Sequence, residues 1–235
     1  MGLFYSNKPG PGIDKDAPPA KGLRLFFQTL AREFFSLIKV NFLFYLFCIP
    51  IITIPASYCA MTRISVNMVR DKPYFLWDDF WKTFRAEFAK STIAGIAIAA
   101  GLTAAIVSAR YYGNLAESSA IFWILFCLAT FGAFLLLFTS FSLFPIISIV
   151  DLPLRKAAKN AFILISVSFF RYILALIICA ALLLLGVMLF PYSILPAFLI
   201  YPSFLNLITV FSAYGGIKKY ILQEQTEASV PTQPD

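Results

Sequence analysis

The chain has 235 residues, of which 60% are hydrophobic and only 13% are charged, and its mean hydropathy is +0.81. Soluble domains are about 45–50% apolar and about 25% charged. This chain carries too few charges to cover a soluble globule of its size, which excludes a soluble enzyme of the usual kind, a collagen and a disordered protein. Its 26 Phe residues fit helices that face lipid, with aromatic anchors at the membrane surface. We expect a helical membrane protein.

The residue types that are absent from the sequence limit the reactions and metal sites that it can support. The sequence contains no His, so it has no Ser-His or Cys-His pair and no imidazole metal ligand. Asp78 and Asp79 are adjacent, so on a helix they would point about 100° apart and not face each other as acid and base. The Cys residues lie singly in apolar stretches without CxxC spacing: Cys48, Cys59, Cys127 and Cys179. We expect no enzymatic activity, no catalytic residue, no metal site and no cofactor.

Three regions follow from the composition along the chain. Residues 1–21 are polar and rich in Pro and Gly, which predicts a flexible amino-terminal tail; they hold no apolar run long enough for a signal peptide. Residues 22–221 contain the hydrophobic stretches and are predicted to form one helical transmembrane domain. Residues 222–235 are predicted to form a polar carboxy-terminal tail.

Four stretches are apolar over the length of about 20 residues that a membrane crossing needs. They are residues 91–112, 120–147, 172–190 and 194–213. The stretch 34–69 is harder to interpret, because Pro50 and Pro55 interrupt it, and it is too long for one crossing and slightly short for two. It predicts either a tight helical hairpin that turns at the prolines or one crossing followed by an interfacial helix.

The Lys and Arg residues favour the hairpin. Loops on the cytoplasmic side of a membrane carry an excess of these residues. A hairpin gives six crossings with both termini cytoplasmic, and places fifteen cations inside and only Arg110 outside. Five crossings with a cytoplasmic carboxy terminus would put the first five cations outside as well. We therefore predict about six transmembrane helices in the bacterial plasma membrane. Cations spread between hydrophobic stretches suit anionic lipid as a partner and not nucleic acid.

The segment WDDFWKTFRAEFAK, residues 77–90, predicts an amphipathic helix. Its acidic residues fall in the first turn and its cations follow, which agrees with the helix dipole. Aromatic residues recur at helical spacing: Trp77, Phe80, Trp81, Phe84 and Phe88. We expect this helix to lie in the cytoplasmic interface of the membrane. The commoner role for such a helix is to connect and orient the next crossing, and the alternative is a docking face for a partner.

A few polar side chains fall inside the predicted crossings. Arg63 and Asn67 are four residues apart and share one helix face. If Asn41 and Asn206 also point inward, the four form a small polar cluster. Hydrogen bonding between helices is the commoner use of such side chains, and a substrate pathway is the alternative. Lys39 lies close enough to its helix end to extend toward the lipid headgroups.

Four sequence segments carry a family resemblance. They are NKPGPGIDKDAPPAKG, FFSLIKVNFLFYLFCIPIITIPASYCAM, FWKTFRAEFAKS and, more weakly, FPIISIVDLPLRKAAKNAFIL. In this order they resemble the YesL-like family of bacterial integral membrane proteins, also described as a domain of unknown function. The resemblance implies no transferable activity, but members are often encoded beside genes for carbohydrate uptake and polysaccharide utilisation.

These observations support two functional hypotheses. The first is a non-enzymatic accessory or regulatory partner of carbohydrate uptake, in a complex with a carbohydrate transporter or sensor. The second is a small transporter or channel whose own substrate pathway passes through the polar cluster. Pro196 and Pro202 could break the last crossing, as carriers often require near the membrane midplane.

Overall fold

The structure, a computed structural model, describes residues 22–115 and 119–219, and these ranges contain helices and their connections without a strand. The elements in chain order are α1 (Leu23–Phe47), the 3-10 turn η1 (Ile51–Thr53), α2 (Ile54–Val69), α3 (Leu76–Ala86), α4 (Phe88–Leu115), α5 (Ala120–Ile149), α6 (Leu154–Met188) and α7 (Ile194–Ile217). The predicted all-α class is confirmed. Residues 1–21 of the predicted amino-terminal tail and 222–235 of the carboxy-terminal tail lie outside the described ranges.

Helix α2 lies at the centre of the molecule. It packs against α1, α3, α4, α5 and α7, and twelve of its 16 residues are buried. Pro55 in its first turn is compatible with a helix start, where the missing N–H has no helical acceptor. At its other end Asp71 adopts a left-handed conformation with φ 53°, and the Lys72 N–H donates to the Asn67 carbonyl at 3.0 Å. These features form a Schellman-type helix end, which terminates α2 before the chain continues into α3.

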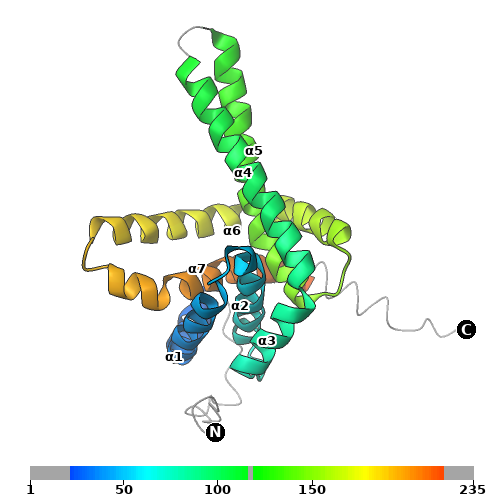
Figure 1. Cartoon of the computed structure of the whole chain (residues 1–235), viewed down its shortest axis with the longest axis vertical. Coiled ribbons are helices and arrows are strands. Elements are labelled where there is room, and N and C mark those ends of the chain that lie inside the picture. The colour runs from blue at the N-terminus through cyan, green and yellow to red at the C-terminus, as the bar shows by residue number, and fades with distance from the viewer. Residues whose placement is uncertain (1–21, 116–118, 220–235) are drawn as a thin grey trace, which may run out of the picture.

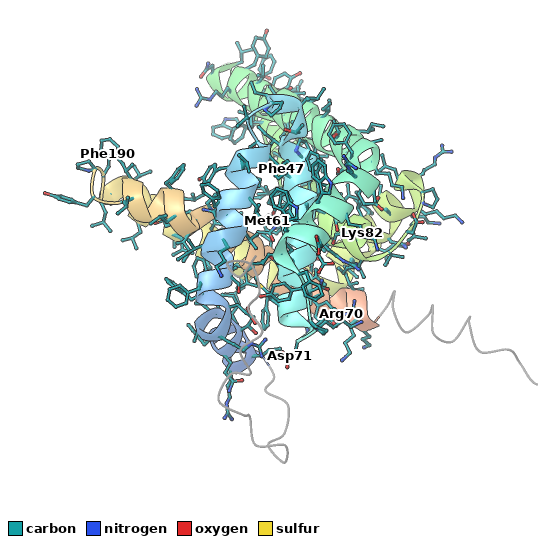
Figure 2. The ribbon with its side chains drawn as sticks, turned by 60° about the horizontal axis from the view of Figure 1, so that its bottom comes forward. Phe47, Met61, Arg70, Asp71, Lys82 and Phe190 are labelled. Atoms are coloured by element: carbon teal, nitrogen blue, oxygen red, sulfur yellow. The ribbon has the colours of Figure 1, made fainter. Side chains whose placement is uncertain are left out.

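Two long hairpins extend from this centre in different directions (Figure 1). One consists of α4 and α5, and the other of α6 and α7, which runs to the side, roughly across the first. The outer end of the second hairpin is apolar and exposed, with Met188 74% and Phe190 69% accessible, and Phe190 marks that end in Figure 2. A large exposed apolar surface of this kind fits contact with lipid.

Within the part of the chain that the structure describes, four helices are long and apolar enough to cross a membrane: α4, α5, α6 and the Phe198–Ile217 part of α7. The other two predicted crossings differ from these. Helix α1 carries charges in its part up to Lys39, among them Arg32 and Glu33. Helix α2 has 16 residues and is about 24 Å long at 1.5 Å per residue, against about 30 Å of hydrocarbon. A membrane protein is therefore supported, and the number of six crossings stays a prediction.

The chain turns at the two prolines as predicted, and the crossing of the membrane by both helices stays a prediction. Helix α1 ends at Phe47, η1 spans the residues after Pro50, and α2 then returns along α1, so that Arg32 of α1 contacts residues at the end of α2. The tip of this hairpin reaches only the beginning of α4, because Pro55 packs against Gly95. The rest of α4 and α5 projects beyond it (Figure 1).

Two predicted boundaries were wrong. The helix predicted over residues 77–90 breaks at Glu87, whose backbone is not helical (φ −104°, ψ 12°), so Phe88 belongs to α4. Helix α6 begins at Leu154, eighteen residues before the apolar stretch 172–190 from which its crossing is predicted. It can do so because its small Ala157 and Ala161 are fully buried, which gives this polar segment an apolar face to pack.

The close contact between α2 and α4 can be tested at Gly95. A Cβ added there would come within 2.5 Å of the rigid Pro55 ring at Cγ, so Gly95→Ala should destabilise the protein by about 1–3 kcal/mol through overpacking. The matched control is Gly132→Ala in α5, where a Cβ meets nothing within 4 Å and should be neutral or stabilising by up to about 1 kcal/mol. Thermal unfolding of both variants in detergent measures the difference. Equal melting temperatures would contradict the described packing.

Candidate functional site

The predicted polar side chains enter separate contacts between helices and not one shared pocket. Asn206 of α7 is 1% exposed, and its Nδ2 donates to Oγ1 of Thr62 in α2 at 2.8 Å. One turn along, the hydroxyl groups of Tyr58 and Thr209 approach to 3.5 Å. These contacts form a buried polar seam between α2 and α7. The Asn206 Oδ1 atom has no hydrogen-bond partner in the described residues.

Asn41 of α1 compensates for a proline in α7. Pro202 lies inside α7 and has no N–H to donate to the carbonyl four residues earlier, which is that of Phe198. The Asn41 Nδ2 atom donates to this same carbonyl oxygen at 2.7 Å. The buried Asn41 side chain, only 1% exposed, thereby supplies the bond that the proline removes and joins α1 to α7.

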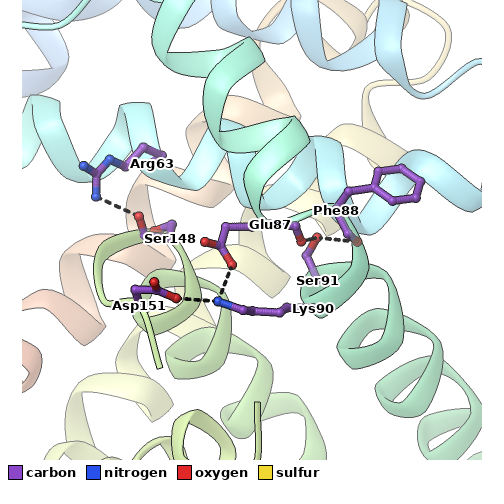
Figure 3. A network of polar contacts seen from close by, with 7 residues as sticks. All are labelled: Arg63, Glu87, Phe88, Lys90, Ser91, Ser148 and Asp151. Atoms are coloured by element: carbon purple, nitrogen blue, oxygen red, sulfur yellow. Dashed lines mark hydrogen bonds and ion pairs between the residues drawn. The ribbon is translucent and has the colours of Figure 1, made fainter. Parts of the chain in front are cut away.

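Arg63 reaches the end of a different helix. Its Nη1 donates to the carbonyl oxygen of Ser148 in the last turn of α5, at 2.7 Å (Figure 3). The last carbonyls of a helix lack helical donors, and a cation there also interacts favourably with the helix dipole. Asn67, on the same face of α2, is 7% exposed. Arg63 of α2 therefore binds the carboxyl end of α5.

A second charged group lies close to Arg63 and was not predicted from the sequence. The Lys90 Nζ atom lies 2.6 Å from Asp151 Oδ1 and 3.3 Å from Glu87 Oε2 (Figure 3). The hydrogen bond from Lys90 holds the pKa of the Asp151 carboxyl below its usual value. The Glu87–Lys90 spacing signals an ion pair along one chain segment, but nothing in the sequence indicates that Asp151, 61 residues later, joins it.

The aromatic face of α3 lies against α1. The ring of Phe47, at the end of α1, has its centroid 5.1–6.1 Å from four rings of α3, those of Trp77, Phe80, Trp81 and Phe84. Phe80 is 1% exposed, whereas Trp77 is 45% exposed. The predicted amphipathic pattern therefore marks a face that packs largely on the protein, with Trp77 at its edge.

The described residues offer few side-chain arrangements that could bind a metal ion or catalyse a reaction. Within residues 22–115 and 119–219 no group of three or more His, Cys, Asp or Glu side chains could hold a metal ion. Asp151 is almost fully exposed, with 90% of its side chain accessible, and surface ion pairs of this kind contribute little stability. Among the described polar residues, Asn41, Arg63 and Asn206 join helices, and Arg63 also binds a helix end.

The comparison with protein families gives a match to part of the chain. Residues 35–109 match the model of a protein of unknown function, DUF624. The match confirms the predicted resemblance to the YesL-like family. No curated protein and no solved structure matches the chain. The DUF624 match contains Asn41 and Arg63, and the carbonyls that both residues bind, on Phe198 and Ser148, lie outside it. These two side chains therefore connect the DUF624 segment to the rest of the bundle.

The pairing of Asn41 with Pro202 can be tested by a double-mutant cycle. Asn41→Ala leaves the Phe198 carbonyl without a donor and should cost about 1 kcal/mol, the usual size of a hydrogen bond between membrane helices. In a Pro202→Ala background the residue at 202 again has an N–H, so Asn41→Ala should cost clearly less. Unfolding of the four proteins in detergent measures the coupling energy. Additive effects of the two substitutions would show that Asn41 does not act on this carbonyl.

Proposed function

We propose that this chain is a multi-pass protein of the bacterial plasma membrane that acts without catalysis, as an accessory or regulatory partner of carbohydrate uptake and utilisation. One observation supports an accessory role. Three of the four polar side chains that the sequence singled out bind other helices: Asn41 binds α7, Arg63 binds α5 and Asn206 binds α2. A substrate pathway needs polar groups that are free to take a substrate. The link to carbohydrates rests on the family resemblance alone, and the partner would be a carbohydrate transporter or sensor complex.

A transporter is the second candidate, and specific features favour it. The amide oxygens of Asn41 and Asn206 are buried without a hydrogen-bond partner in the described residues. In addition, Pro145 and Pro202 lie inside α5 and α7, and Ser168 interrupts the helical geometry of α6. Carriers often bind substrates at interrupted helices near the membrane midplane.

The two candidates differ in what the protein does alone. An accessory reconstituted by itself in lipid vesicles should take up no labelled sugar, although a strain lacking the protein should grow poorly on particular carbohydrates. Arg63→Met removes the ligand of the α5 end and should lower abundance, with growth following the amount of protein that remains. Lys82→Met, an exposed cation on α3, is the matched control and should change neither.

Either of two results would favour the transporter. One is uptake of a sugar by the purified protein in vesicles. The other is an Arg63→Met protein of normal abundance that fails to support growth on particular sugars. Quantitative immunoblotting beside the growth curves separates loss of protein from loss of function.

The proposed topology has both termini in the cytoplasm and six helices in the membrane, of which α1 and α2 either both cross it or turn back within it. Topology reporters fused after Lys8 and after Gln225 should both read cytoplasmic, and one after Asn114, between α4 and α5, should read outside. The reason is the fifteen-to-one distribution of Lys and Arg residues together with their preference for the inner side. An amino terminus that reads outside would favour five crossings.

The α1–α2 hairpin needs its own measurement, because it returns the chain to the same side whether or not it crosses. A Cys at position 51, at the hairpin tip, should react with an impermeant thiol reagent added outside if the hairpin crosses. A tip that remains within the bilayer would be protected from both sides, and the protein would then have four full crossings with the same sidedness.

A further inference from the structure

An apolar groove of about 420 Å³ opens between α1, α3 and α7. Phe42 and Leu46 of α1 and Trp77 of α3 line it and are 44–67% exposed, so the groove is open to the surroundings. The rings of Tyr45 and Phe198 also line it and stack on each other, with centroids 4.5 Å apart. Its size is within the range of small-molecule sites in proteins, but nearly all its lining atoms are apolar.

Of the described residues that line this groove, Lys39 alone is charged. Its side chain is exposed, and none of the ion pairs found among the described residues includes it. An ammonium group beside an apolar groove matches a ligand that has an anionic head and a long apolar chain. Lys and Trp side chains commonly occur together where lipid headgroups meet hydrocarbon.

The position of Lys39 along the hairpin agrees with the depth of the headgroups. Lys39 lies eight residues before the end of α1, and Arg63 lies nine residues after the start of α2. Because α1 and α2 are antiparallel, both lie at a similar distance from the turn, about 12 Å for Lys39 and about 14 Å for Arg63 at 1.5 Å per residue. Arg63 lies in turn beside the charged group of Glu87, Lys90 and Asp151 (Figure 3). Lys39 thus belongs to a polar layer below the apolar tip of the hairpin.

We propose that this groove binds one anionic phospholipid of the surrounding bilayer. An acyl chain lies along Phe42 and Leu46, and the phosphate pairs with the Lys39 ammonium. The site requires that the α1–α2 hairpin turns back within the bilayer, which keeps Lys39 at the inner headgroups, and it does not depend on the proposed role in carbohydrate uptake. It would link α1, α3 and α7 through a lipid and make their packing sensitive to the anionic lipid content.

Trp77 provides the measurement, because it lines the groove. A Trp81→Phe, Trp123→Phe protein retains Trp77 as its single Trp. In nanodiscs, phosphatidylglycerol brominated in its acyl chains should quench Trp77 at a lower mole fraction than brominated phosphatidylcholine. The expected preference is about fivefold, the effect of one cation near anionic lipid. Lys39→Gln should abolish the preference and Lys39→Arg should retain it. Lys82→Gln, which removes an exposed cation of α3 outside the groove, should also retain it.

Filling the groove gives an independent test that keeps the charge. Leu46→Phe in the single-Trp protein should weaken quenching by both brominated lipids and leave the melting temperature unchanged. Equal quenching by the two lipids, or the same preference in Lys39→Gln and Lys82→Gln, would overturn the proposal and leave ordinary contact with bulk lipid. Quenching by brominated fatty acid that matches or exceeds that by phosphatidylglycerol would also overturn it, because the occupant would then be a free carboxylate amphiphile.

Discussion

The rest of the bundle depends on the burial of α2. Five helices pack on this 16-residue segment, so burial favours partners within the protein for its polar side chains. The Thr62 hydroxyl has two, since it donates to the Tyr58 carbonyl and accepts from Asn206, whereas the Ser57 and Ser65 hydroxyls have none among the described residues. A helix in that position also has to approach its neighbours closely, which Gly95 permits at Pro55. Small and singly hydroxylated residues are the usual means of such packing in membranes.

Two arginine side chains bind the carboxyl ends of neighbouring helices. Arg32 of α1 contacts the Met68 carbonyl and Asp71 at the end of α2, and Arg63 of α2 contacts the Ser148 carbonyl at the end of α5. Arginine stays charged in proteins, and the negative end of a helix dipole is a favourable neighbour for a cation. The two contacts run in sequence from α1 to α2 and from α2 to α5. The helices that carry the apolar tip are thereby fixed to the base of the α4–α5 hairpin.

The sequence predicts the helices well because their signals are local. Long apolar runs mark α4, α5 and α7, and Pro50 and Pro55 mark the turn between α1 and α2. The break at Glu87 carries no such signal, because the aromatic and basic pattern continues across it into α4. The partners of Asn41 and Arg63 are backbone carbonyls more than eighty residues away, and which carbonyls are free depends on how whole helices meet. Side-chain type showed that these residues would be buried or paired, but it could not show with what.

The apolar tip of the α1–α2 hairpin limits how this protein can sit in a membrane. Ile49, Ile51 and Ile52 at the tip are 60–83% exposed, and the hairpin ends where α4 still has some twenty residues to run beyond Gly95. A tip that passed through the bilayer would place these isoleucines in water on the far side. A tip that turns back in the hydrocarbon keeps them in an apolar medium and leaves Lys39 and Arg63 toward the inner headgroups. The distribution of cations is the same in both cases, because residues 40–62 contain no Lys or Arg. The positive-inside rule therefore does not distinguish a hairpin that crosses the bilayer from one that turns back within it. The cost of exposing the apolar tip to water favours the hairpin that turns back.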